Sequence, residues 1–134
     1  MKNHLFLSIT AFVLFFVSCS ETEYNNKWDD NIHLSQKTAT FNAVGDSITI
    51  TTGGSGWWIT EIAIDEVIYT VMTEIDIQSE SYSVTKNGIT AQRRNKNTLF
   101  IKADANTLTT NRIISVGLED GNYFDGVRIT QKAK

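Results

Sequence analysis

A chain of 134 residues is long enough to bury one hydrophobic core but short for two domains. It contains 12 basic residues against 15 acidic ones, a net charge of −3. This acidic balance, with no basic stripe along the chain, argues against a nucleic-acid-binding protein. One small basic cluster, Arg93, Arg94 and Lys96, falls in a predicted turn, and we expect a solvated tip there rather than a phosphate site.

Residues 1–18 have the pattern of a secretory signal and are not expected to belong to the fold. A weakly positive start precedes an apolar run from Leu5 to Val17. As a helix this run would span about 20 Å at ~1.5 Å per residue, too short for the ~30 Å hydrocarbon core of a bilayer. The pattern therefore predicts a signal peptide, with a buried N-terminal helix as the alternative.

Cys19 is the only cysteine, so the chain has no internal disulfide to form. The stretch Phe16-Val17-Ser18-Cys19 resembles the lipobox of bacterial lipoproteins, although leucine is usual where Phe16 stands. The resemblance implies that Cys19 becomes the mature N-terminus and anchors the chain to a membrane through lipid. The alternative is an ordinary signal peptide that ends beside a leftover thiol.

Residues 19–31 are expected to form the lipidated cysteine and a polar tether. The segment from Ser20 to Asn31 is polar and acidic and shows no apolar periodicity. Glu21 and Glu23 are similar to the acidic signals that send some lipoproteins of the Bacteroides group to the cell surface. We therefore expect an outer-membrane lipoprotein at the cell surface, with a periplasm-facing one as the alternative.

Residues 32–134 are predicted to form an all-β domain, because period-2 alternation of apolar residues recurs along them. The expected strands lie at residues 33–35 with 38–41, 47–52, 57–64, 67–77 with a bend near Thr73-Glu74, 81–86, 89–93, and three more within 98–131. Asn87-Gly88 favours a two-residue hairpin turn. About seven to nine short strands and no convincing helix indicate an antiparallel, immunoglobulin-like β-sandwich.

The strand predicted at residues 57–64 begins with two adjacent tryptophans, which must face opposite sides. Regular alternation places Trp58 with Ile62 and Ile64, and Trp57 with Ile59 on the other face. Because the first group is the more apolar, we expect Trp58 in the core and Trp57 on the surface.

Several stretches of this region resemble the BACON domain, a small β-sandwich module of secreted Bacteroidetes proteins. The matching stretches are residues 34–50, Trp57-Trp58 after the glycine-rich loop, and residues 101–131 with Asn106, Arg112 and the closing Ile129-Thr130-Gln131. Two features depart from the family. Residues 65–79 are longer and more apolar than its usual middle, and Tyr82 stands where a second tryptophan is common.

The BACON resemblance implies a link to carbohydrate, because the family is named for one and often stands beside glycan-degrading domains. The implied partners are a polysaccharide or mucin glycan, or a protein of a surface glycan-handling complex. A structural spacer is the alternative. No binding residues transfer from the family to this chain.

The chain is poor in the residues that catalysis needs, and we do not expect an enzyme. Beyond the predicted signal His33 is the only histidine, and Cys19 is assigned to the anchor. A Ser-His-Asp triad or a Cys/His metal cluster therefore lacks its parts. Acidic pairs such as Asp65-Glu66 lie at turn signals, where they serve solvation. No cofactor is expected.

The leading candidate for a ligand site is the segment from Glu119 to Gly126. Exposed aromatic rings there can stack on the apolar faces of sugars, while Asp and Asn side chains bond the hydroxyl groups. The candidate residues are Trp57, Tyr123, Phe124, Asp120, Asn122 and Asp125. Two alternatives stay open: the aromatic residues cover the end of the sandwich core, or the oxygen-rich turn holds calcium without the spacing of a known calcium loop.

Overall fold

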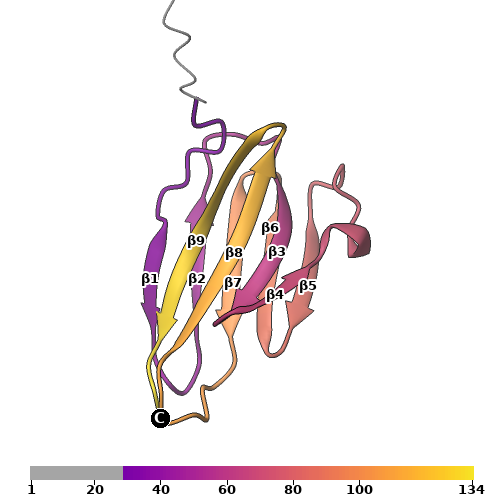
Figure 1. Ribbon diagram of the computed structural model, residues 1–134. Helices are drawn as coiled ribbons and strands as arrows, with labels where there is room; N and C mark the ends of the chain where they lie inside the picture. Colours follow the sequence, from indigo (N-terminus) through magenta and orange to yellow (C-terminus); the bar gives the residue numbers. More distant parts are fainter. Residues whose placement is uncertain (1–28) are drawn as a thin grey trace, which may run out of the picture.

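The structure is a computed structural model that describes residues 29–134, in which all regular structure is β-strand apart from one 3-10 turn (Figure 1). The elements are β1 (Thr38–Phe41), β2 (Asp46–Thr51), β3 (Trp58–Ile64), β4 (Val67–Thr70), the 3-10 turn η1 (Met72–Glu74), β5 (Tyr82–Lys86), β6 (Ile89–Arg94), β7 (Thr98–Ala103), β8 (Arg112–Asp120) and β9 (Tyr123–Gln131). The predicted signal peptide, Cys19 and most of the predicted tether lie outside the described residues.

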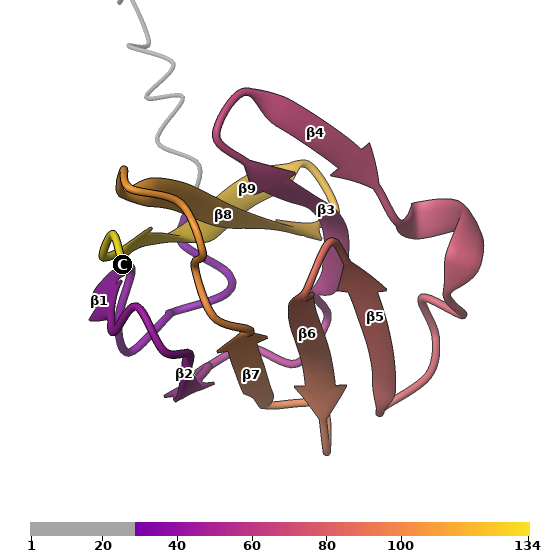
Figure 2. The same cartoon turned by 90° about the horizontal axis from the view of Figure 1, so that it is seen from below.

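The strands form two facing sheets, which confirms the predicted β-sandwich. One sheet has five strands in the order β1-β9-β8-β3-β4, and the other has four in the order β2-β7-β6-β5. Figure 2 shows the two layers edge-on, with the β4–η1–β5 connection passing from one to the other.

One strand pair departs from the predicted antiparallel arrangement. All strand pairs within the described chain are antiparallel except β1 and β9, which are parallel. The reason is visible in Figure 1: the chain enters β1 from the same end of the sandwich at which β9 begins, so the two strands run in the same direction.

The core consists of the apolar side chains that alternate inward from both sheets. The alternation predicted for the last three strands is confirmed, since Leu99, Ile101 and Ala103 are buried, as are their counterparts on β8 and β9. Burial of each large aliphatic side chain contributes about 1.5–3 kcal/mol. The buried apolar residues are Ile32, Phe41, Ile50, Trp57, Ile59, Ile62, Val71, Val84, Ile89, Ala91, Leu99, Ile101, Ala103, Ile114, Val116, Leu118, Val127 and Ile129.

The sequence-based placement of the two tryptophans is wrong, and a β-bulge is the reason. Trp57 is 0% exposed, whereas Trp58 is half-buried on the opposite face of β3. Ile59 pairs with Leu118 and Glu61 with Gly117, so Thr60 is an extra residue on β3. An extra residue reverses the alternation beyond it, and both Ile59 and Ile62 therefore point inward.

The turns largely follow the predictions. Asn87 and Gly88 have φ values of 44° and 78° and connect β5 to β6 as the predicted two-residue hairpin. The long strand predicted over residues 67–77 is shorter, because β4 ends at Thr70 and η1 begins two residues later. The predicted bend near Thr73-Glu74 therefore exists as this 3-10 turn.

Candidate functional site

Four segments far apart in the sequence meet at the end of the sandwich where the described chain begins (Figure 1). They are residues 29–37, the glycine-rich loop 53–56, the turn 95–97 and the β8–β9 turn. The N–H of Gly54 donates to the carbonyl of Ile32 at 3.1 Å, and the Asn97 side chain donates to the carbonyl of Gly54 at 3.0 Å. We call this end the entry end.

The structure separates the residues that were predicted to share one ligand site. Trp57 is fully buried, so it cannot stack on a ligand. Tyr123 and Asp125 lie on the same face of β9 as the buried residues and point inward. Phe124 points outward and is 67% exposed. Asn122 is exposed at the tip of the turn.

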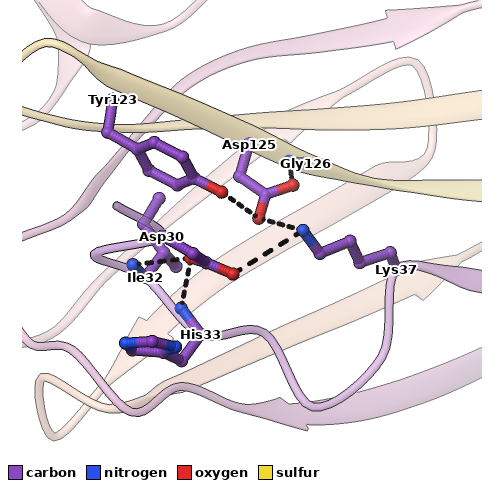
Figure 3. A network of polar contacts seen from close by, with 7 residues as sticks. All are labelled: Asp30, Ile32, His33, Lys37, Tyr123, Asp125 and Gly126. Carbon is purple, nitrogen blue, oxygen red and sulfur yellow. Dashed lines mark hydrogen bonds and ion pairs between the residues drawn. The ribbon is translucent and has the colours of Figure 1, made fainter. Parts of the chain in front are cut away.

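Tyr123 and Asp125 belong to a polar network that joins the β8–β9 hairpin to residues 29–37 (Figure 3). Lys37 Nζ lies 2.7 Å from Asp125 Oδ2 and 3.8 Å from Asp30 Oδ2. The Tyr123 hydroxyl donates to Asp125 Oδ2 at 3.2 Å. Burial first, and then the carboxylates of Asp125 and Asp30, raise the pKa of Tyr123. These side chains are engaged by the fold, and Tyr123 packs against the core as one of the alternatives predicted.

Asp30, which was assigned to the tether, is already part of the folded chain. Its Oδ1 accepts the main-chain N–H groups of His33 at 2.7 Å and Ile32 at 3.0 Å. These bonds, led by the one from His33, lower the pKa of Asp30. The carboxylate of Asp125 raises the pKa of Lys37 through the hydrogen bond between them.

The acidic residues of the β8–β9 turn do not converge on a common point. Asp125 faces Lys37, while the Asp120 carboxylate lies so close to Gly56 that a Cβ there would come within 2.9 Å of Oδ1. In residues 29–134 no group of three or more His, Cys, Asp or Glu side chains is placed to hold a metal ion. Glu119 pairs with Phe124 and Asp120 with Tyr123, so the segment forms a β-hairpin.

A shallow groove of about 310 Å³ lies beside Phe124 on the outer face of the five-stranded sheet. Gly117 on β8 and Gly126 on β9 are direct partners, and their missing side chains leave bare backbone there. The close approach of Glu61 favours glycine at position 117, since a Cβ there would lie 2.8 Å from Cγ of Glu61. The lining of this Phe124 groove is Thr60, Glu61, Thr70, Met72, Gly117, Leu118, Glu119, Phe124 and Asp125.

A second hollow of about 280 Å³ lies beside Trp58. The indole N–H of Trp58 is buried and has no acceptor in the described part of the chain. An unsatisfied buried donor costs about 1–3 kcal/mol. The residues lining this Trp58 hollow are Ser55, Gly56, Trp58, Ile77, Gln78, Glu80, Arg93 and Lys96.

Arg93 is buried in the wall of the Trp58 hollow, so the prediction of a solvated tip is wrong for this residue, whereas Arg94 and Lys96 are exposed as predicted. Only 5% of the residue is exposed, and its guanidinium carbon lies 5.0 Å from the centroid of the Trp57 ring. Its N–H groups donate to the carbonyl oxygens of Ser79 at 2.8 Å, of Ser55, and of Lys96 at 3.5 Å. Arg93 thus holds together the loops that contain Ser55, Ser79 and Lys96.

The sequence contains a signal for the burial of Arg93. Arg93 keeps the alternation of Ile89 and Ala91, both of which are buried, so it faces the other sheet. No comparable signal marked Trp58 as the outward tryptophan, because a β-bulge has no distinctive local pattern in this sequence.

Comparisons with known proteins support the fold alone. No protein-family model matches the chain, and no curated protein matches it. A similar fold occurs in a protein from Bacteroides thetaiotaomicron solved by NMR, with 16% sequence identity and a TM-score of 0.61. The match covers 82% of this chain and 93% of that one. No helix in residues 29–134 is long and apolar enough to cross a membrane.

Proposed function

We propose that this protein is a non-catalytic lipoprotein module of the cell envelope that binds glycan through the Phe124 groove. The observation that carries the proposal is the ring of Phe124, which is 67% exposed beside a groove with glycine backbone in its lining. An exposed ring beside bare backbone offers a flat apolar platform on which the C–H face of a sugar can lie.

The rest of the groove suits the hydroxyl groups of a sugar. Glu61 and Glu119 supply carboxylate oxygens, and Thr60 and Thr70 supply hydroxyl groups that both donate and accept. Ligand sites of this kind combine apolar contact with a few polar groups that fix orientation.

The expected location of the protein and its resemblance to the BACON domain support the same proposal. A lipidated Cys19 would place the domain at the envelope, at the cell surface or facing the periplasm. The BACON resemblance links such modules to polysaccharide and mucin glycans, and the structural neighbour from Bacteroides thetaiotaomicron shares the fold.

The test is a glycan array followed by affinity electrophoresis, with the full chain purified in detergent. We expect specific retardation by a polysaccharide and loss of that retardation in Phe124→Ala. Leu108→Ala is the matched control, because Leu108 is 54% exposed and lies outside the groove. Retardation that survives in Phe124→Ala, or hydrolysis of any glycan by the purified protein, would contradict the proposal.

A protein-contact or spacer role in a surface glycan-handling complex is the second candidate. Val67 and Ile68 are 55% and 62% exposed on β4, which is an edge strand of its sheet. Exposed apolar edge strands pair readily with other chains. Silence on the glycan array, together with a protein partner that Ile68→Lys releases, would favour this role.

A further inference from the structure

The Trp58 hollow contains a buried positive charge without a negative partner. Only 5% of Arg93 is exposed, and no Asp or Glu of residues 29–134 forms an ion pair with it. Buried charges are ordinarily paired, because removal of an ion from water is costly. Main-chain carbonyls satisfy part of the guanidinium, and its remaining N–H groups have no acceptor in the described chain.

A second cation stands at the rim of the same hollow. Lys96 Nζ lies 2.7 Å from Glu80 Oε1, and their side chains are 49% and 64% exposed. Exposed pairs of this kind are weak and are readily exchanged for another partner. The hollow therefore has two cations against one carboxylate, although the whole protein is acidic.

Strand pairing brings the Trp58 hollow close to the Phe124 groove, although the two share no lining residue. Trp58 on β3 pairs with Glu119 on β8, and Glu119 pairs with Phe124 on β9. The three residues thus form one row across the outer face of the sheet. Two strand spacings of ~4.8 Å separate the ends of the row by about 10 Å. A short oligosaccharide can therefore contact both ends.

We propose that the Trp58 hollow binds the carboxylate of an acidic sugar, of the hexuronic acid class, within the glycan that occupies the Phe124 groove. This inference rests on the proposed function and names the ligand class. The sugar ring lies against the exposed part of the Trp58 indole. The carboxylate accepts hydrogen bonds from Arg93 and Lys96, which supplies the missing negative charge.

The probes are an oligogalacturonate of about four units and its methyl ester, titrated into the full chain in detergent. We expect the acid to bind about 10-fold more tightly than the ester, a free-energy difference of one charge-assisted contact. This preference should shrink as salt is added, because exposed charges are screened. The indole N–H resonance of Trp58, assigned with Trp58→Phe, should shift with the acid.

Three charge variants separate ligand recognition from folding, since removal of Arg93 itself would loosen the three loops that it bonds. Lys96→Gln should weaken binding of the acid about 10-fold. Lys102→Gln makes the same charge change outside the hollow and should leave binding unchanged. Glu80→Gln should strengthen binding, because it removes the carboxylate that competes for Lys96.

The outcomes distinguish this inference from the proposed function. Equal binding of acid and ester, or equal effects of the Lys96 and Lys102 variants, would overturn the acidic subsite while glycan binding at Phe124 stands. Acetate that matches the affinity of the oligosaccharide would overturn the sugar assignment. Failure of every glycan to bind would remove the proposed function together with the inference.

Discussion

Trp57 connects the core to the loops of the entry end. Its indole N–H donates to the Thr52 hydroxyl at 2.9 Å, and that hydroxyl donates to the carbonyl of Gly54 at 2.7 Å. The guanidinium of Arg93 covers its ring. One side chain therefore supplies apolar area, a satisfied hydrogen bond and a cation–π contact.

Trp57→Ala should lower the free energy of unfolding by about 3–5 kcal/mol, the cost of a large cavity in a packed core. That is a large share of the roughly 5–15 kcal/mol available to a small domain. Trp58→Ala should cost less, since Trp58 is only half-buried. Denaturant unfolding followed by circular dichroism measures both.

Phe124→Ala is the control for the tryptophan variants and should change the unfolding free energy by about 0.5 kcal/mol or less, as exposed positions do. A larger loss for Trp58→Ala than for Trp57→Ala would mean that β3 keeps the regular alternation and has no bulge.

At the scale of elements, the bulge in β3 decides which side chains reach the core. It lets Ile59 and Ile62 both point inward, and it leaves the N–H of Ile59 beyond the end of β4. The Tyr82 hydroxyl on β5 accepts that N–H at 2.8 Å and so links the two sheets. Burial raises the pKa of Tyr82.

Deletion of Thr60 should be tolerated far better than deletion of Phe100 from the regular strand β7. Without Thr60, Ile59 and Ile62 keep their partners Leu118 and Val116 and still point inward. Without Phe100, Ile101 and Ala103 turn out of the core, and the loss for Ile101 alone is about 1.5–3 kcal/mol. Thermal melts of the two deletion variants compare them, and similar melting temperatures would contradict the assignment of Thr60 as the extra residue of a bulge.

Alternation and turn residues were sufficient to predict most elements of the sandwich. The strands of residues 98–131 and the Asn87-Gly88 hairpin follow from local pattern alone. The bulge at Thr60 and the parallel pairing of β1 with β9 do not, because both are set by contacts between distant segments.

The candidate site could be predicted only in part, because contacts between distant segments also decide which of its residues are free. Phe124 lies outside the core as the local pattern requires. Tyr123 and Asp125 belong to the same aromatic and polar stretch as Phe124. They nevertheless lie in a network with Lys37, which is more than eighty positions earlier in the chain. A local pattern cannot show which polar residues another segment will occupy.

At the scale of the whole molecule, the network of Figure 3 joins the first described residues to the last hairpin. Asp30, Lys37 and Asp125 bring together two segments that are also linked by the β1–β9 ladder. The entry of the chain is thereby fixed to the hairpin that displays Phe124.

The pH dependence of stability should reveal this network. The folded-state pKa of Asp30 is lowered, so its contribution is present above the unfolded pKa of about 3.9 and is lost as pH falls through the lowered value. The pKa of Lys37 is raised, so its contribution is present below about 10.4 and is lost as pH rises through the raised value.

Asp30→Asn should therefore flatten the acid limb of a plot of melting temperature against pH, and Lys37→Gln the alkaline limb. Asp29→Asn is the matched control on the preceding residue. If Asp30→Asn and Asp29→Asn give the same acid limb, Asp30 has no part in the stability of the folded chain.

The position of Phe124 beside the chain entry has a mechanical consequence. A ligand that pulled on the start of β9, against an anchor that pulled on the chain before Asp29, would load the polar network and the β1–β9 ladder. It would also load the bonds from Gly53 and Gly54 to Ile32, whose side chain is buried in the core. Tension at the entry would therefore reach both sheets, through β1 on one side and through the pairing of Leu34 with Thr52 on the other.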